Sequence, residues 1–317
     1  MKKTIRDILP DINELGYVRV AGAVPVTTIG DVERNVAEHY RLAKQAEEQQ
    51  VDIVCFPELG LTSYSIKDTF LREQLIRDAR QGLREYCELT EDLRVISIVG
   101  LPWRDVSDRL LNVAAVIKDG YVLALIPKSY LPNYNEFEEE RWFLAALGLQ
   151  FANVDFYGQS VPLGTDILID CVGIDCSFGV EICEDGWMPI PPSCLGAANG
   201  AHLYFNLSAS PEKIGSDKYR RDYVVNPQSA RCVSGYIYVS AGQSESTTGV
   251  VFGGHTLISE NGSLIVEKQP LTGDGELLVT DIDIDKLRAE RRRSNTWGHS
   301  AKFWSAHFPY RRFSTVI

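Results

Sequence analysis

The stretch that decides the fold of this chain is Gly179-Val180-Glu181-Ile182-Cys183-Glu184-Asp185-Gly186-Trp187. In the segment that leads into it and through its first half, apolar residues recur at every second position, at Ile174, Cys176, Phe178, Val180 and Ile182. A period of two is typical of a strand with one apolar face, and Glu184-Asp185-Gly186 predicts a sharp turn directly after it. Cys183 is therefore expected where a strand ends and the backbone bends, so that its thiol faces a cleft close to turn amides. The alternative at this point is a buried structural cysteine, the commoner fate of a lone cysteine.

Composition favours one large soluble domain. The 317 residues are 44% hydrophobic and 24% charged, which is normal for a globular protein with a substantial core. Length alone suggests two domains, but no Ser/Gly/Pro-rich tract and no block of like charge divides the chain, so we expect a single α/β domain over residues 1–317. The net charge of −11 argues against nucleic acid and against anionic membrane surfaces as partners.

Cysteine and histidine usage points to a reduced, metal-free protein. The seven cysteines are an odd number without CxxC spacing, which predicts free thiols in the cytoplasm. The five histidines are isolated from one another, so we expect no metal site. Asp7 and Pro10 interrupt the start of the chain, and no apolar stretch is long enough to cross a bilayer. We therefore expect no secretory signal and a cytoplasmic location.

Strand and helix patterns alternate along the chain. Strands are expected at 18–24, 51–56, 95–101, 110–117, 121–126, 166–171, 174–182, 203–207, 236–241, 254–259, 263–268 and 277–282. Helices are expected at 31–49, 69–89, 193–199 and 219–233, with a short one from Asp283. Asp119-Gly120 lies between two apolar runs and favours a hairpin turn. This order implies mixed sheets with helices outside, and two sheets packed face to face.

Three strand ends carry chemically useful side chains. Glu58 follows an apolar strand and Pro57, and Lys128 follows another strand and Pro127. Taken singly, Glu58 is equally a turn or helix-capping residue, Lys128 a solvated lysine, and Cys183 a core residue. Together, a carboxylate, an ammonium and a thiol that each leave the end of an apolar strand can converge at one sheet edge.

These three residues, in this order and context, resemble the Glu-Lys-Cys triad of the nitrilase superfamily of carbon–nitrogen hydrolases. Four segments are similar to the glutaminase (amidase) domain of glutamine-dependent NAD+ synthetases: 56–65 (FPELGLTSYS), 127–137 (PKSYLPNYNEF), 182–185 (ICED) and 206–211 (NLSASP). The resemblance implies a four-layer αββα sandwich. It also implies a homo-oligomer, assembled across the helical faces.

One part of those synthetases has no counterpart here. Their ATP-using domain is marked by a Ser-Gly-Gly-x-Asp-Ser phosphate loop, which neither Ser234-Gly235-Tyr236 nor Gly253-Gly254-His255 matches. ATP, Mg and deamido-NAD+ would belong to that missing synthetase domain, so no cofactor is expected in this chain. The chain is then either a glutaminase half, with a synthetase domain or subunit as the partner that receives ammonia, or a stand-alone amidase.

The resemblance assigns roles in the hydrolysis of glutamine to ammonia and glutamate. Cys183 attacks the side-chain amide, Glu58 serves as the base, and Lys128 stabilises the oxyanion. Glu136 is expected to position Lys128 or water, although it is equally an ordinary acidic residue beside Glu138, Glu139 and Glu140. Residues expected to bind the substrate are Tyr64, Tyr134, Glu184, Trp187, Ser208, Ser210 and Arg220.

Two other functions stay open on the sequence alone. The first is an amidase or nitrilase that acts on a different small amide. The second is a catalytically silent module that serves oligomerisation. The intact set of three catalytic residues argues against this second function.

Overall fold

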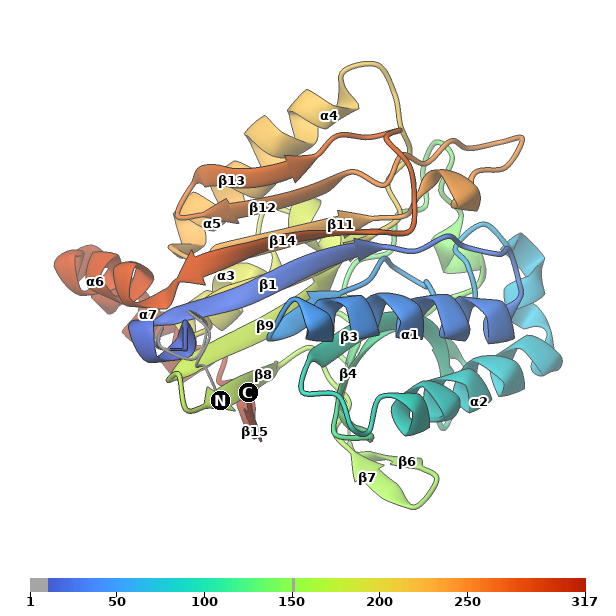
Figure 1. Ribbon diagram of the computed structural model, residues 1–317, viewed down its shortest axis with the longest axis horizontal. Coiled ribbons are helices and arrows are strands. Elements are labelled where there is room, and N and C mark those ends of the chain that lie inside the picture. The colour runs from blue at the N-terminus through green and yellow to red at the C-terminus, as the bar shows by residue number, and fades with distance from the viewer. Residues whose placement is uncertain (1–10, 150–151) are drawn as a thin grey trace, which may run out of the picture.

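The computed structural model describes residues 11–149 and 152–317 (Figure 1). The first ten residues, on which the expectation of no secretory signal rests, lie outside the described residues. In the part that is described, no helix combines the length and the apolar composition needed to span a bilayer.

The first sheet has six strands in the order β14-β1-β2-β3-β4-β5. In that order their bounds are Glu276–Asp283, Tyr17–Val24, Ile53–Cys55, Ile96–Arg104, Leu110–Lys118 and Tyr121–Pro127. Strands β1, β2 and β3 are parallel, while β14, β4 and the β4–β5 hairpin pair antiparallel. The sheet is therefore mixed, as the alternating order of strands and helices predicted.

The second sheet has seven strands in the order β13-β12-β11-β10-β9-β8-β15. In that order their bounds are Ser263–Lys268, Thr256–Glu260, Gly235–Ser240, Leu203–Ser208, Cys176–Ile182, Ile167–Val172 and Arg311–Val316. Strands β9, β10 and β11 are parallel at the centre of this sheet. A separate two-stranded hairpin consists of β6, Val154–Phe156, and β7, Gln159–Val161.

Helices cover the outer faces of both sheets. The helices are α1 (Val32–Glu48), α2 (Glu73–Leu89), α3 (Pro192–Ala198), α4 (Ser216–Tyr219), α5 (Asn226–Cys232), α6 (Ile284–Arg293) and α7 (Asn295–His307). Short 3-10 helices lie at Asn13–Leu15, Lys67–Leu71, Glu139–Arg141, Cys183–Trp187 and Gln243–Glu245, and a π-helical turn spans Arg220–Val225. Helices α1 and α2 lie side by side on the first sheet, whereas α3 and α5 pack on the second (Figure 1).

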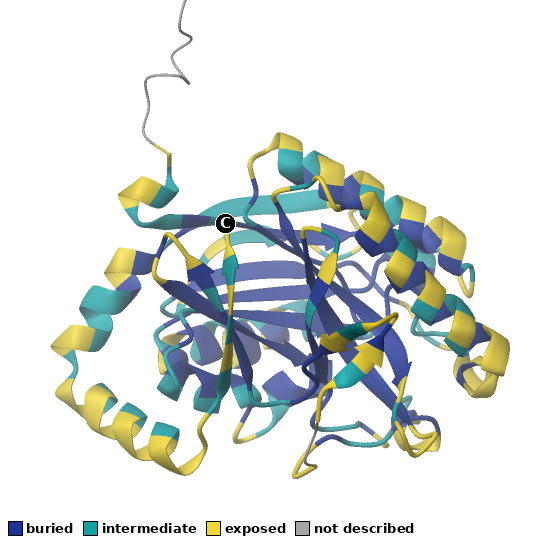
Figure 2. Ribbon diagram, turned by 90° about the horizontal axis from the view of Figure 1, so that it is seen from below, coloured by how far each residue is buried: buried dark blue, intermediate teal, exposed yellow. Residues whose placement is uncertain are grey.

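The alternation of side chains along each strand divides the core into layers. In β1, Val18 and Val20 face the second sheet, while Ala21 and Ala23 face the layer of α1 and α2. A large apolar cluster thus fills the space between the sheets, and further clusters lie beneath the helices on each side. Figure 2 shows the buried strands between helices whose outward sides are exposed. This arrangement is the four-layer αββα sandwich that the resemblance implied.

Most elements lie where the sequence predicted them, and the differences have local causes. Residues 219–233 form a helix interrupted by the π-helical turn, not one regular α-helix. Helix α7 was not predicted, because none of its residues is buried and it therefore lacks an amphipathic period. Strand β15 was also missed: it is a polar edge strand that pairs with β8, far away in the sequence.

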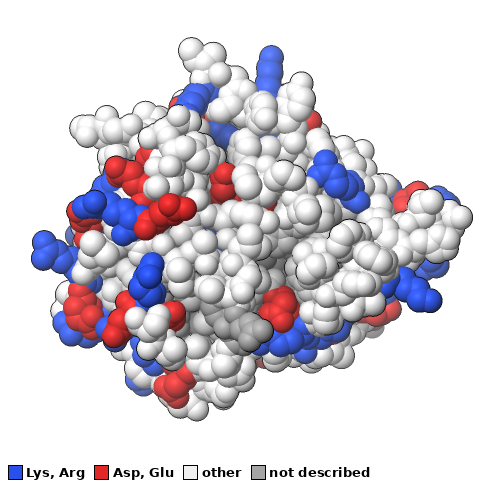
Figure 3. Space-filling model, turned by 180° about the vertical axis from the view of Figure 1, so that it is seen from behind, with Lys and Arg blue, Asp and Glu red and all other residues white. Residues whose placement is uncertain are grey.

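On the face opposite to that of Figure 1, basic and acidic side chains are intermixed around a broad area that carries neither (Figure 3).

Candidate active site

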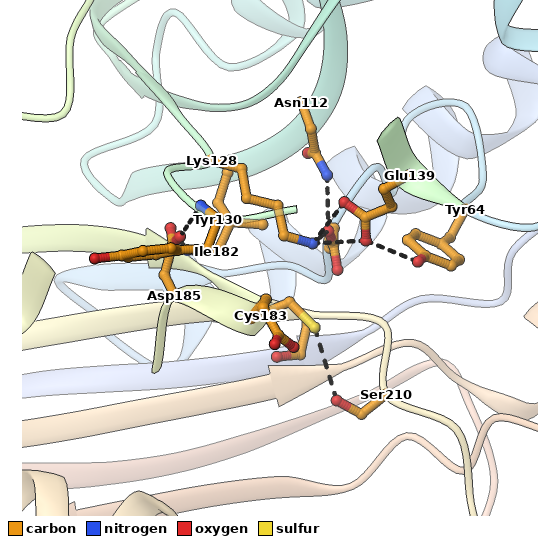
Figure 4. Close-up of polar contacts among 12 residues, drawn as sticks. Tyr64, Asn112, Lys128, Tyr130, Glu139, Ile182, Cys183, Asp185 and Ser210 are labelled. Carbon is orange, nitrogen blue, oxygen red and sulfur yellow. Dashed lines mark hydrogen bonds and ion pairs between the residues drawn. The ribbon is translucent and has the colours of Figure 1, made fainter. Parts of the chain in front are cut away.

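Three side chains from distant parts of the chain meet where β2, β5 and β9 end. Glu58 follows β2 by a short turn. Lys128 and Cys183 directly follow β5 and β9 (Figure 4). Strands β2 and β5 run in the same direction, because one parallel and two antiparallel pairings separate them. All three residues are buried, with 1%, 1% and 4% of their surface exposed, respectively. The convergence predicted from the three strand ends is present.

The backbone around Glu58 packs closely against the neighbouring strand. A Cβ atom on Gly100 of β3 would lie 2.3 Å from the backbone nitrogen of Leu59, so only glycine admits this turn. Oε1 of Glu58 accepts hydrogen bonds from Asn112 Nδ2 at 2.7 Å and from Lys128 Nζ at 2.6 Å. Oε2 of Glu58 has no hydrogen-bond partner among the described residues. One oxygen is thus held while the other keeps its lone pairs free to take a proton.

Lys128 lies between two buried carboxylates. Its ammonium donates to Glu58 and also to both oxygens of Glu139, at 2.7 and 2.8 Å. Burial lowers the pKa of Lys128, but the charges of Glu139 and Glu58 outweigh it and hold this pKa well above its ordinary value. Lys128 therefore carries a positive charge in a water-poor site, where a cation stabilises a developing oxyanion strongly.

The carboxylate that positions Lys128 is Glu139, which corrects the expectation for Glu136. Glu136 instead forms an ion pair with Lys213, 2.6 Å away, and lines a small pocket beside Tyr64. The sequence offered no signal to choose among neighbouring glutamates. Only the chain path decides it, because the 3-10 helix that begins at Glu139 turns this side chain inward.

Cys183 has a strained backbone at the end of β9. Its φ of 46° lies in the left-handed region, which is uncommon for a residue other than glycine and typical of a nucleophile held on a sharp turn. Burial, and then the charge of Glu58, raise the pKa of Cys183 well above its ordinary value, while Lys128 acts in the opposite direction. The resting sulfur is therefore a neutral thiol, and its attack on a carbonyl requires a base to take the proton as the bond forms.

Asp185 ties the ends of β5 and β9 together. Oδ2 of Asp185 accepts the backbone N–H of Ile182 at 2.9 Å, and Oδ1 accepts those of Ser129 and Tyr130 at 3.0 and 2.9 Å. One buried carboxylate thus holds the backbone before Cys183 and the backbone after Lys128. The sequence showed this residue only as part of a turn, and it gave no sign that the turn clamps a second strand.

Four of the expected substrate-binding residues lie at or near the catalytic groups. Tyr64 donates to Oε1 of Glu139 at 2.8 Å, and Tyr134 donates to the carboxylate of Glu184 at 2.9 and 3.0 Å. The hydroxyl of Ser210 lies 3.8 Å from the sulfur of Cys183. Glu184 is 7% exposed, and burial raises its pKa. A buried carboxylate beside the nucleophile favours a cationic group on a ligand.

The other three have partners of their own, so their expected contact with substrate has no support in the geometry. The hydroxyl of Ser208 donates to Oδ1 of Asn206 at 2.7 Å. The ring of Trp187 stacks on that of Tyr219, with ring centroids 5.8 Å apart.

Arg220 is 1% exposed, and both of its terminal nitrogens are engaged with neighbours. They donate to the two oxygens of Glu212 at 2.8 and 2.7 Å, to Ser216 at 2.8 Å and to the carbonyl of Pro211 at 3.3 Å, and they contact His255 at 2.8 Å. Arg220 therefore braces the chain after Ser210 and does not present its charge to a ligand, which corrects the expectation that it binds substrate.

The structure also places two polar residues at the site that sequence reasoning missed. Asn112 lies on β4 and fixes Glu58; its signal was a single polar residue within the apolar run 110–117. Tyr238 lies on β11 and donates to Ser210 at 2.7 Å, and a tyrosine in an apolar strand carries no such signal. Among the described ranges 11–149 and 152–317, no three His, Cys, Asp or Glu side chains are grouped to hold a metal ion.

Comparisons with known proteins identify the family of this chain. The carbon–nitrogen hydrolase family model matches residues 18–292. The glutamine-dependent NAD(+) synthetase of Mycobacterium tuberculosis is 39% identical over 285 residues, which are 89% of this chain and 41% of that protein. The synthetase of Thermotoga maritima is 31% identical over 271 residues, 85% of this chain and 42% of that protein. The chain spans less than half of the length of these relatives.

Solved structures show the same fold. The glutamine-dependent NAD(+) synthetase from Cytophaga hutchinsonii superposes with a TM-score of 0.73 at 28% identity, covering 84% of this chain and 43% of that one. An amidase from Nesterenkonia sp. superposes with a TM-score of 0.65, covering 87% of this chain and 95% of that one; at 21% identity this likeness concerns the fold alone.

Proposed function

The chain belongs to the carbon–nitrogen hydrolase family, and from that premise we propose that it hydrolyses the side-chain amide of glutamine to glutamate and ammonia. The observation that carries the proposal is the buried contact of Lys128 with Glu58 at 2.6 Å, beside the strained Cys183. A free carboxylate oxygen, a fixed cation and a thiol are the three groups that amide hydrolysis through a thioester requires.

In the first half of the reaction, the sulfur of Cys183 attacks the amide carbon. Because the thiol is neutral at rest, Oε2 of Glu58 takes its proton during the attack. The negative charge that develops on the amide oxygen is stabilised by Lys128 and by the backbone N–H that follows Cys183. One such donor contributes roughly 2.7–4 kcal/mol to lowering the barrier. Glu58 then returns the proton to the departing ammonia, which leaves a thioester on Cys183.

In the second half, water enters and Glu58 takes one of its protons. The hydroxide equivalent attacks the thioester carbon, Lys128 again stabilises the oxyanion, and the C–S bond breaks. Glu58 returns the proton to the sulfur, and glutamate leaves. Glu139 holds Lys128 in place through both halves, because it contacts the ammonium with both oxygens.

The choice of glutamine among amides rests on the charge around the nucleophile. Glu184, a buried carboxylate next to Cys183 that accepts from the half-exposed Tyr134, is suited to the α-ammonium of an amino acid. Two relatives that are more than 30% identical over most of this chain are glutamine-dependent NAD(+) synthetases. We therefore propose that the ammonia serves a synthetase domain or subunit.

A panel of amides tests the proposal. Ammonia release is measured with glutamine, asparagine, a glutamine analogue that lacks the α-amino group, and simple aliphatic amides. We expect the highest kcat/KM for glutamine, and a marked loss for the analogue without the ammonium. A better rate with an aliphatic amide would identify an amidase with another substrate.

The nucleophile is checked on the same protein. A glutamine-mimicking electrophile should add once, at Cys183, as read by intact mass and peptide mapping. Cys183→Ala should abolish both the adduct and ammonia release while its circular dichroism matches that of wild type. A wild-type chain that stays unlabelled and releases no ammonia would point to a silent module.

A further inference from the structure

Outside the active site, two cysteines lie side by side in the second helical layer. Cys194 is on α3 and Cys232 is the last residue of α5, and these helices pack against each other. Nε2 of Gln228 donates to both sulfurs, at 3.2 Å to Cys194 and at 3.1 Å to Cys232. The same nitrogen lies 2.9 Å from the hydroxyl oxygen of Ser193, so its two N–H groups are shared among three acceptors, and both sulfurs lie around one amide.

The amide of Gln228 is held in this orientation from its other end. Its oxygen accepts a hydrogen bond from the guanidinium of Arg231 at 2.8 Å, so its NH2 group must face the sulfurs. Cys232 donates to the carbonyl of Ser193 at 3.5 Å. The N–H groups of Gln228 and the nearby guanidinium of Arg231 favour negative charge on Cys194, whereas the bond to the Ser193 carbonyl keeps Cys232 a neutral thiol.

The two thiols differ in access and in acidity. Cys194 is partly exposed, and it lines a cavity of about 250 Å³ together with Cys232, Arg231, Trp297 and Trp304. A hydrogen bond from Cys232 lowers the pKa of Cys194 to about 7 against the effect of burial. Cys232 is buried, and its own pKa is raised, first by its bond to Cys194 and then by burial. Cys194 is therefore the thiol suited to attack a reagent, and Cys232 is the thiol suited to react after it.

A second pair of neighbouring cysteines shows that proximity alone does not produce this arrangement. Cys171 and Cys176 are directly opposite each other in the β8–β9 ladder, but they are 2% and 1% exposed and belong to the core between the sheets. Burial raises the pKa of Cys171 to about 12 and that of Cys176 well above its ordinary value. This pair serves as an internal control.

We propose that Cys194 and Cys232 form a thiol-exchange site, in which Cys194 is modified by a small disulfide and Cys232 resolves the modification. The thiolate of Cys194 attacks one sulfur of the reagent, so that a mixed disulfide forms and the reagent's S–S bond breaks with release of one thiolate. Cys232 then attacks the sulfur of Cys194, the mixed disulfide breaks, and the proton of Cys232 passes to the second leaving thiolate. The two cysteines lose two electrons, and the reagent is reduced to two thiols.

The probe for this site is bis(2-hydroxyethyl) disulfide, added to the reduced and desalted chain. Reaction is stopped with acid and read by intact mass and peptide mapping. In wild type we expect the loss of two hydrogens, with the peptides of Cys194 and Cys232 linked. With Cys232→Ser we expect one stable hydroxyethylthio adduct on Cys194, and with Cys194→Ser neither product at these positions.

Rates give the quantitative criterion. Cys194 is the more exposed of the two thiols and its pKa is lowered, whereas burial raises the pKa of Cys171. Because the thiolate is the attacking species, modification at Cys194 should exceed modification at Cys171 by at least about a hundredfold. The proposal would be overturned by equal rates at Cys194 and Cys171, or by no reaction at Cys194. It would also be overturned by an adduct on Cys194 of the wild-type chain that Cys232 does not displace. The wild-type measurement decides the matter even if a serine variant does not fold, and it is independent of glutamine hydrolysis.

Discussion

Lys128 donates to both carboxylate oxygens of Glu139, at 2.7 and 2.8 Å, where neither side chain is exposed by more than 1%. The contact holds the ammonium at the end of β5, beside Glu58, and removes its freedom to rotate away from the nucleophile. Two carboxylates around one ammonium leave an excess negative charge. Burial raises the pKa of Glu139 to about 7, and the charge of Glu58 adds to this effect, although Lys128 opposes it. The predictions below start from this cluster.

Replacing Lys128 by methionine should damage both stability and turnover. The substitution leaves Glu58 and Glu139 buried without a cation, which costs roughly 3–5 kcal/mol of unfolding free energy. The loss of the oxyanion donor should lower kcat by roughly 10²–10³-fold. Urea unfolding and ammonia release measure the two effects.

The control is Lys67→Met, because Lys67 pairs with Glu138 where both side chains are more than half exposed. Its unfolding free energy should change by no more than about 1 kcal/mol. A Lys128→Met variant that raises KM at an unchanged kcat would contradict the oxyanion role.

Glu139→Gln and Glu136→Gln separate two neighbouring glutamates. Glu139 positions Lys128 through two charged hydrogen bonds, each contributing roughly 1.5–3 kcal/mol, so its substitution should lower kcat by about tenfold to a hundredfold. Glu136 pairs with a lysine that is 60% exposed, so its substitution should change kcat by less than about threefold. Steady-state kinetics with glutamine measure the two values of kcat. A larger loss of kcat in Glu136→Gln than in Glu139→Gln would support the original expectation that Glu136 positions Lys128.

Asp185→Asn should make the position of Lys128 relative to Cys183 less fixed. The amide oxygen can still accept from Ser129 and Tyr130, but the NH2 group faces the N–H of Ile182, so one buried donor loses its acceptor at a cost of roughly 1–3 kcal/mol. Because Asp185 acts through the two strand ends, kcat should fall more than KM rises. Labelling of Cys183 by a glutamine-mimicking electrophile should slow in parallel. Unchanged labelling in a destabilised variant would mean that Asp185 is purely structural.

Stability should fall as pH rises from about 4.5 to 7 because of Glu245. This carboxylate is 2% exposed and accepts the N–H of Ser65, and burial raises its pKa from 4.5 to about 7. Between these values the folded chain binds a proton that the unfolded chain has lost, so unfolding becomes easier as pH increases and the full cost is reached above pH 7. Glu245→Gln should remove up to roughly 3 kcal/mol of this cost at pH 8 and little of it at pH 4.5. Urea unfolding of wild type and Glu245→Gln at the two pH values checks the sign. The prediction is contradicted if the unfolding free energy of the variant minus that of wild type is smaller at pH 8 than at pH 4.5.

Much of the fold and the centre of the site could be predicted from local signals. The alternation before Cys183, the Asp119-Gly120 turn and the prolines before Glu58 and Lys128 each reflect backbone chemistry within a few residues. Such signals do not depend on the rest of the chain, which is why the strands around these residues lie where they were expected.

The remainder depended on contacts between distant segments. Glu136 and Glu139 have the same side chain, and only the path of the loop decides which one contacts Lys128. The role expected of Arg220 was wrong because its guanidinium donates to Glu212 and to neighbouring groups. No local sequence pattern predicts such a hydrogen-bond network.

The sequence by itself determined the order of most strands and helices and the three strand ends that carry Glu58, Lys128 and Cys183, since periodicity and turn chemistry act over short range. Only the tertiary structure decided how Asn112, Glu139 and Asp185 hold these groups, and that Cys194 lies against Cys232. The physical reason is that hydrogen bonds and ion pairs require atoms within about 3 Å, a condition that residues far apart in sequence meet only after the sheets and helices have packed.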